Sequence, residues 1–312
     1  MYRLSTDTQE LLDFLSYRRP AGSKTEKTWI SQFIRPLGVQ QDSQGNLFKK
    51  VGGEDRILWS SHTDTVHKEG GRQTAILEAG RLKLAGMGNC LGADCAAGAW
   101  LMVQMARAHV PGLYVWHRGE EHGGIGSAYI AQQSPEALEG IKFAIAFDRR
   151  GTDSIITHQM PGRTCSDEFA WSLADAIGLG HKPDDTGLFT DTANYAALVG
   201  ECTNISTGTA NEHCPTESLD LNYLLSLRDA ICGADFSRLV EARTPEEPDY
   251  SSYYHSFNAS RPDSVYDLVR DNPREIADYL SDYGISSADL RLAIQERQFG
   301  TIRQFNLEEE WS

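Results

Sequence analysis

Short apolar runs and helix-like patterns alternate along the first 243 residues. Apolar runs typical of buried strands occupy residues 46–49, 57–60, 113–116, 143–147, 154–157 and 202–206. Apolar residues at helical spacing occupy residues 10–15, 25–34, 96–108, 125–132, 169–177, 192–198 and 219–232. Residues 76–77 and 82–84 predict a hairpin that turns at Ala79 and Gly80. This alternation predicts an α/β fold, a three-layer domain whose mostly parallel mixed central sheet is flanked by helices.

The composition changes near residue 244, where proline and acidic residues gather. The stretch Thr244-Pro245-Glu246-Glu247-Pro248 and residues 249–255 are typical of a linker. Helical patterns return at residues 265–269, 274–280 and 287–295 and predict short helices. We therefore expect one domain at residues 1–243, followed at residues 244–312 by a linker and a small helical C-terminal extension.

The charge balance narrows the range of partners. The 312 residues carry 29 Lys and Arg against 44 Asp and Glu, which gives a net charge of −15. Nucleic-acid binding requires clustered Lys and Arg, so we expect no nucleic-acid partner. The sequence has no apolar run near the ~18 residues that a membrane span needs, and we expect no membrane partner. Because its first residues lack the apolar stretch of a signal peptide, we expect a cytoplasmic protein.

Six cysteines are scattered along the chain, at Cys90, Cys95, Cys165, Cys202, Cys214 and Cys232. We expect reduced thiols, because the chain is large and carries no export signal. A zinc finger built on cysteines is disfavoured, since no two cysteines stand in a Cys-x-x-Cys pair.

Polar side chains follow several of the predicted strands, at the point where each strand ends. They are His62 and Asp64 after 57–60, Glu120 and Glu121 after 113–116, Asp148 after 143–147 and His213 after 202–206, with Asp94 in a glycine-bearing loop before a helix. Strand ends of α/β sheets are where ligands bind. Taken singly, each has an ordinary alternative: a hydrogen-bonding histidine for His62, a helix N-cap for Asp94, and a solvated acidic loop for the glutamates.

Together these residues predict a metal site. Two adjacent glutamates repel each other unless a cation or a proton compensates, which favours a role for Glu120 and Glu121 beyond the structural one. Zinc binds histidine nitrogen and carboxylate oxygen, and two ions a few ångströms apart assist both the attacking and the departing group.

The order of these motifs resembles the co-catalytic zinc exopeptidases, which include bacterial leucyl aminopeptidases, peptidase T-like enzymes and glutamate carboxypeptidase relatives. The matching pieces are His-x-Asp, Gly-Ala-Asp, Gly-Glu-Glu-x-Gly-x-x-Gly-Ser, a later Asp, and the segment His213-Cys214-Pro215-Thr216-Glu217-Ser218. Residues 42–47 resemble the strand and turn that precede the first ligand of the family. The resemblance covers roughly residues 8–235.

The resemblance implies a role for each residue at the site. Asp94 would bridge two divalent metal ions, His62 and Asp148 would hold one ion, and Glu121 and His213 would hold the other. Glu120 would be the general base that takes a proton from a water shared by the ions. Asp64 would orient the ring of His62. Zn²⁺ is the expected metal, and Mn²⁺ and Co²⁺ suit the same ligands. Cys95 departs from the Asp, Asn or Ser that relatives commonly carry after the bridging Asp.

One spacing points to the subfamily. Asp148 and His213 are 213 − 148 = 65 residues apart. Carboxypeptidase-type relatives insert a dimerising lid of about 100 residues there, the length of a domain. The chain therefore resembles the compact aminopeptidase type without an inserted lid.

These observations predict a metal-dependent hydrolase of peptide or peptide-like amide bonds, most simply an aminopeptidase or dipeptidase acting on a small peptide. Two alternatives stay open: a deacylase of N-acyl amino acids or another small amide, and an inactive metal-binding module that acts through its C-terminal helices. Arg149, Arg150 and Asp191 are candidate substrate-binding residues, because arginine can clamp a carboxylate and Asp191 stands where relatives shape the pocket. A homo-oligomer is a further possibility.

Overall fold

A mixed β-sheet forms the centre of the fold. The structure, a computed structural model, describes residues 4–53, 56–86, 88–160, 162–245 and residue 277. In these residues the neighbouring strands of the main path run in the order β2 (Gln40–Gln41), β3 (Leu47–Val51), β8 (Gly112–His117), β4 (Ile57–His62), β9 (Phe143–Arg150), β14 (Glu201–Ala210), β15 (Ser218–Asp220), β7 (Arg81–Leu84) and β6 (Ala75–Glu78). The four strands β8, β4, β9 and β14 pair in parallel, and the flanking strands pair antiparallel.

Shorter pairings lie off this path. Strand β10 (Ser154–Ile156) joins β14 and β13 (Lys182–Asp184), while β1 (Tyr17–Arg18) pairs with β5 (Gly71–Arg72) and β11 (His158–Gln159) with β12 (Gly162–Arg163). The hairpin of β6 and β7 turns at Ala79 and Gly80, both in the left-handed region with φ of 50° and 79°. Backbone of that kind favours the tight two-residue turn that the sequence predicts.

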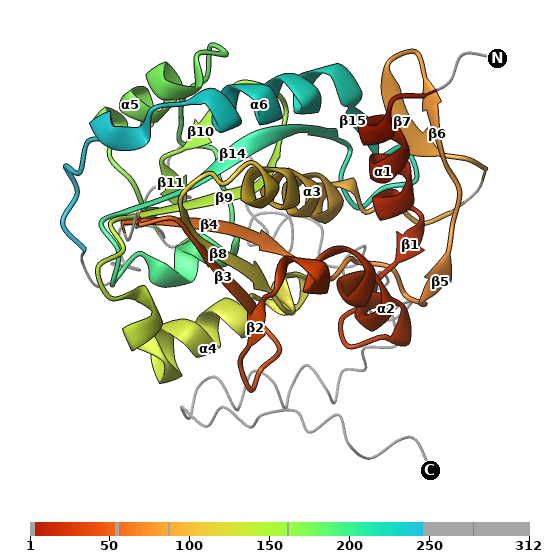
Figure 1. Ribbon diagram of the computed structural model, residues 1–312, viewed down its shortest axis with the longest axis horizontal. Helices are drawn as coiled ribbons and strands as arrows, with labels where there is room; N and C mark the ends of the chain where they lie inside the picture. The colour runs from red at the N-terminus through yellow and green to blue at the C-terminus, as the bar shows by residue number, and fades with distance from the viewer. Residues whose placement is uncertain (1–3, 54–55, 87, 161, 246–276, 278–312) are drawn as a thin grey trace. The chain divides into compact units, whose positions relative to one another are not determined.

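Helices cover both faces of the sheet (Figure 1). They are α1 (Thr6–Leu15), α2 (Lys24–Phe33), α3 (Ala93–Arg107), α4 (Ile125–Gln133), α5 (Asp167–Ile177) and α6 (Leu221–Gly233), with the 3₁₀ turns η1 (Arg35–Leu37), η2 (Glu120–His122), η3 (Pro135–Leu138), η4 (Asp191–Tyr195) and η5 (Phe236–Arg238). Helix α3 packs on β4 and β9 and contacts α1 and α6. The predicted α/β fold with helices on both sides of a mixed sheet is confirmed. The sheet is less parallel than predicted, because parallel pairing on the main path is confined to its four central strands.

The alternation of side chains along the strands creates one core on each face. Trp59 of β4 and Phe147 of β9 stack at 5.8 Å between ring centroids, in the core that contains α3. Leu58 and Ala144, their neighbours on the opposite face, pack with Ile130 of α4 in a second core. Burying a large apolar side chain contributes about 1.5–3 kcal/mol, so these two cores hold the sheet rigid beneath its strand ends.

One predicted helix is wrong. Residues 192–195 belong to the 3₁₀ turn η4, which stops at Tyr195, so no α-helix forms at residues 192–198. The side chains in this segment bond elsewhere: the Thr192 hydroxyl donates to the carbonyl of Thr203, and Asn194 donates to Ser127. Such polar side chains compete with helical hydrogen bonding, and here the tertiary contacts prevail.

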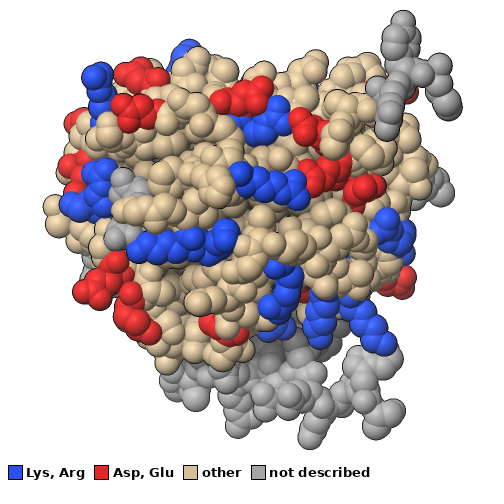
Figure 2. All heavy atoms as spheres, in the orientation of Figure 1, with Lys and Arg blue, Asp and Glu red and all other residues tan. Residues whose placement is uncertain are grey.

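All six cysteines are free. The helices predicted at 265–269 and 287–295, the helix predicted at 274–280 apart from residue 277, and most of the predicted linker lie outside the described residues. Among the residues that the structure describes, no helix is both long and apolar enough to cross a membrane. Figure 2 shows acidic and basic side chains interspersed over the face on which α3, α5 and α6 lie.

Candidate metal centre

The parallel strands bring the predicted ligands to one edge of the sheet. His62 is the last residue of β4, Glu120 and Glu121 form η2 directly after β8, and Asp148 lies near the end of β9. His213 follows β14, and Asp94 lies in the first turn of α3. Because β4, β8, β9 and β14 run in parallel, their carboxyl ends share this edge.

The first group of possible metal ligands consists of His62, Glu120 and Asp148. One donor atom from each lies within 4.8 Å of the others. The Nε2 atom of His62 is 3.5 Å from Oδ1 of Asp148. The other Asp148 oxygen, Oδ2, accepts a hydrogen bond of 2.9 Å from the Thr190 hydroxyl, which fixes the direction of the carboxylate.

The second group consists of Asp94, Glu121 and His213, again with donor atoms within 4.8 Å of one another. The Nε2 atom of His213 lies 2.8 Å from Oδ2 of Asp94 and 3.2 Å from Oε1 of Glu121. These two carboxylates raise the pKa of His213 to about 11. His213 is half exposed and has a φ of 61°, a left-handed conformation that is uncommon outside glycine and clusters at functional sites.

Unsatisfied buried atoms indicate that a cation fits this edge. Both ring nitrogens of His62 and the Oε1 atom of Glu121 are buried without a hydrogen bond. Buried polar atoms are rarely left without partners in proteins, unless they serve a ligand or an ion. Burial raises the pKa of Glu120 to about 10, a rise that His62 opposes and the neighbouring carboxylates of Asp148, Asp191 and Glu121 increase. Nitrogen and carboxylate oxygen donors in this arrangement suit zinc.

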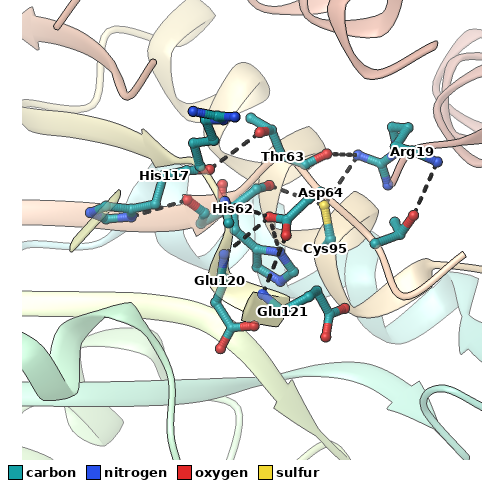
Figure 3. Close-up of polar contacts among 12 residues, drawn as sticks. Arg19, His62, Thr63, Asp64, Cys95, His117, Glu120 and Glu121 are labelled. Atoms are coloured by element: carbon teal, nitrogen blue, oxygen red, sulfur yellow. Dashed lines mark hydrogen bonds and ion pairs between the residues drawn. The ribbon is translucent and has the colours of Figure 1, made fainter. Parts of the chain in front are cut away.

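Asp64 connects the two sides of the site. Its Oδ1 lies 3.5 Å from Nδ1 of His62 and accepts hydrogen bonds from the backbone N–H groups of Gly119 and Glu120 at 3.1 and 3.2 Å, while its Oδ2 accepts from the N–H of Glu121 at 3.3 Å. Burial alone would raise the pKa of Asp64, but the contacts with His62 and with backbone N–H groups hold it below its usual value. Figure 3 shows the carboxylates of Glu120 and Glu121 below the ring of His62 in this view, and Asp64 above it.

Asp94 is not the N-cap of its helix. Gly92 occupies that position, with a φ of 69° and no side-chain cap. The carboxylate of Glu217 instead accepts hydrogen bonds from the N–H groups of Leu91, Gly92, Ala93 and Asp94, at 2.7–3.4 Å. Because Glu217 satisfies the helix terminus, the side chain of Asp94 faces His213.

The three candidate substrate-binding residues lie in different surroundings. Asp191 is only 1% exposed, and its Oδ1 accepts from the Ser127 hydroxyl at 2.6 Å, while Oδ2 lies 3.3 Å from Nδ1 of His117. Burial raises the pKa of Asp191 to about 7. Arg149 bonds Asp184 and Thr186, and Arg150 is exposed two residues after Asp148.

Four residues with contacts to the site carried no predicted role: Arg19, Thr190, Asn204 and Glu217. The Asn204 side chain accepts from the backbone N–H of Asp148 at 2.8 Å. The sequence did hold a signal for Glu217. A glycine before a helix has no side chain to accept from the first N–H groups, so an acceptor from elsewhere in the chain is expected. The others contact the site from segments distant in sequence, and no local pattern marks them.

Comparisons with known proteins give one family match and several structures of similar fold. Residues 46–191 match the model of peptidase family M28. No curated protein sequence matches the chain. Among solved structures, the chain is similar to the aminopeptidase PepT from Bacillus cereus, with 15% identity, a TM-score of 0.62, and coverage of 72% of this chain and 96% of that one.

Two further solved structures share the fold. A tripeptidase from Staphylococcus aureus has 13% identity, a TM-score of 0.61, and coverage of 72% of this chain and 96% of its own. The Pyrococcus horikoshii TET1 peptidase, which can assemble into a tetrahedron or a large octahedral shell, has 16% identity, a TM-score of 0.56, and coverage of 72% and 98%. The M28 match includes the glycine-bearing loop, both glutamates and Asp148, so the chain is similar to peptidase family M28 over residues 46–191, the part that carries most of the candidate ligands.

Proposed function

We propose that this chain is a metal-dependent aminopeptidase that hydrolyses small peptides. The observation that carries the proposal is the meeting of two donor groups, His62 with Asp148 and Asp94 with Glu121 and His213, at one edge of the sheet beside Glu120. Family M28 and the aminopeptidase neighbours support the same reaction class.

The residues present would hold two divalent ions. His62 and Asp148 would bind one ion, Glu121 and His213 the other, and Asp94 would contribute to both. Zn²⁺ suits these donors, and Mn²⁺ or Co²⁺ could take the same places. Bound ions supply the Lewis acidity that activates water and polarises a carbonyl group.

Glu120 is the proposed general base. It lies with His62 and Asp148 in one group of donor atoms, all within 4.8 Å of one another. Its carboxylate would accept a proton from water and return it to the departing amine. The N–H groups of Glu120 and Glu121 both bond to Asp64, so the base and the neighbouring ligand are held by one anchor.

Substrate recognition is proposed for side chains near Asp148. Arg150 is exposed and follows Asp148 by two residues, which suits an interaction with a substrate carboxylate. Arg149 already bonds Asp184 and would need to exchange that partner. Asp191 is buried, so any effect on the substrate would pass through His117 or Ser127.

The test compares Glu120→Gln with the wild type on a panel of di- and tripeptides. The variant should keep its bound metal, measured by elemental analysis, and lose at least about 100-fold in kcat, the usual contribution of a general base. Glu136→Gln, an exposed glutamate of η3, is the matched control. Substantial turnover by Glu120→Gln would reject the assignment of the base.

The panel also separates the alternatives. An aminopeptidase cleaves peptides with a free amino terminus and not their N-acetylated forms, whereas a deacylase shows the opposite preference. A wild-type protein that binds metal but cleaves neither set would be a metal-binding module.

A homo-oligomer is proposed only by analogy with the TET1 peptidase, whose assembly is part of its description. Light scattering on the purified chain would test it, and a monomeric mass would reject it.

A further inference from the structure

Arg19 is a fully buried arginine close to the candidate metal centre. Its side chain is 0% exposed and lies over the ring of Trp29, 4.1 Å from the centroid. Within the described part of the chain, no carboxylate comes within ion-pairing distance of its guanidinium. A charged group is costly to bury unless hydrogen bonds replace its hydration, so the partners that it does have are informative.

Those partners lie next to His62 at the end of β4 and next to Asp94 at the start of α3. The Nη1 atom donates to the carbonyl of Thr63 at 3.1 Å, directly after His62. The Nη2 atom donates to the carbonyl of Gly92 at 3.3 Å, two residues before Asp94. One planar guanidinium therefore bridges the end of β4 and the start of α3 (Figure 3).

Cys95 makes the connection tighter. Its Sγ accepts a hydrogen bond from Nη1 of Arg19 at 3.1 Å and donates to the carbonyl of His62 at 3.0 Å. Cys95 directly follows Asp94 and is fully buried. A continuous chain of hydrogen bonds thus runs from Arg19 through the thiol to the backbone of His62, and hydrogen bonds in such chains reinforce one another.

The backbone of Arg19 is held to the same strand end. Its N–H donates to the Thr65 hydroxyl at 3.0 Å, and its carbonyl accepts from the Thr65 N–H at 2.9 Å. The backbone of Arg19 is therefore held by the segment after β4, and its guanidinium nitrogens are held by the carbonyls of Thr63 and Gly92. Such rigidity is what a group needs in order to set the spacing of two ligands.

We propose that Arg19, acting with Cys95, is a positioning residue that sets the distance between the metal ligands His62 and Asp94. This inference rests on the proposed metal-dependent function. Neither residue contacts a reacting atom in the proposal. Their effect passes through the backbone on which the two ligands stand, as outer residues of metal sites commonly tune affinity.

The experiment measures Zn²⁺ affinity by competition with a chromophoric chelator, alongside thermal unfolding of the metal-free protein. Arg19→Met removes the donors while keeping an unbranched apolar stem, and should weaken Zn²⁺ binding by about 10–100-fold. Arg19→Lys keeps the positive charge but loses the planar guanidinium with its separate donors. Its Zn²⁺ affinity should therefore also be lower than that of the wild type. Arg18→Met is the matched control, because Arg18 lies against Gly71 and makes none of these loop contacts.

Cys95→Ala tests the same chain of bonds by a milder change and keeps the proposal testable if Arg19→Met does not fold. It should weaken Zn²⁺ binding several-fold. The double variant should lose less than the product of the single losses, because both side chains act through one connection. Wild-type affinity in Cys95→Ala and Arg19→Lys, or independent losses in the double variant, would overturn the proposal.

Metal affinity tests the positioning role of Arg19, and peptide cleavage tests the proposed function, so each proposal can be rejected without the other. If the wild type binds zinc tightly but cleaves no peptide, the proposed function is wrong while the affinities still decide the role of Arg19. If the wild type cleaves peptides and the Arg19 variants bind zinc as it does, only the positioning role is wrong.

Discussion

The Nδ1 atom of His62 lies 3.5 Å from Oδ1 of Asp64, and neither side chain is more than 1% exposed. The same carboxylate accepts the backbone N–H groups at the start of η2. One buried aspartate therefore lies beside the ring of His62 and also anchors the loop with Glu120 and Glu121.

Replacing Asp64 by Asn should weaken metal binding. Asparagine has nearly the same shape, but its amide NH₂ would face either His62 or the backbone donors of η2. Because such outer partners typically contribute 10–100-fold, we expect about that loss in Zn²⁺ affinity, measured by chelator competition. Asp175→Asn, an exposed residue of α5, is the control. Equal affinities for the two variants would show that Asp64 does not orient the ligand.

Glu217→Gln should destabilise the start of α3. The carboxylate accepts four backbone N–H groups, whereas the glutamine side chain offers one uncharged oxygen. Hydrogen bonds to charged groups contribute about 1.5–3 kcal/mol each, so we expect a loss of a few kcal/mol in the free energy of unfolding. Urea denaturation measures this loss against Glu69→Gln, an exposed control. An unchanged unfolding midpoint would contradict the capping role.

The layered α/β fold and the strand ends of the site were predictable because both depend on local patterns. Strands such as 143–147 are short apolar runs, and the period of two that they share sets which side chains enter each core. His62 and Asp148 stand at the ends of such runs. The topology of parallel strands then brings them together without further information.

Contacts between distant segments were not predictable in the same way. Glu217 reaches a helix more than 120 residues away in sequence, and Arg19 reaches both ligand loops from the N-terminal region. Residues 192–198 read as a helix because their apolar spacing is helical, while the hydroxyl of Thr192 is committed to β14. Tertiary hydrogen bonds of this kind leave no periodic trace in the sequence.

His181 should make stability depend on pH. It is 1% exposed, and its Nε2 lies 2.7 Å from the Tyr223 hydroxyl. Burial lowers its pKa below the usual 6.5, an effect that Asp153 partly opposes. Below pH 6.5 the unfolded chain binds this proton more readily than the folded chain, so the free energy of unfolding falls as the pH falls, by at most about 1.4 kcal/mol per pH unit.

His181→Gln should remove this contribution. Urea denaturation from pH 7.5 down to pH 5 should show the wild type losing stability relative to the variant as the solution becomes more acidic. His109→Asn, at the surface, controls for the loss of an imidazole. A difference between wild type and His181→Gln that stays constant across this range would contradict the burial of a neutral imidazole.

Gly98→Ala should destabilise the chain, against the usual trend for helices. Alanine in place of glycine within a helix ordinarily gains about 0.5–1 kcal/mol. At Gly98 of α3, an added Cβ would lie 2.0 Å from the carbonyl oxygen of Phe147, a backbone atom of β9 that cannot rotate away. Relieving the clash requires α3 to move off the sheet, and overpacking of this kind costs about 1–3 kcal/mol.

The matched control is Gly233→Ala at the end of α6, where nothing lies within 4 Å of the added Cβ. Urea unfolding should therefore separate the two variants, with Gly98→Ala below the wild type and Gly233→Ala equal to it or above. Because Asp148 follows Phe147, zinc affinity should fall in the first variant alone, and equal stability and affinity in both would show that α3 and β9 are not in close contact.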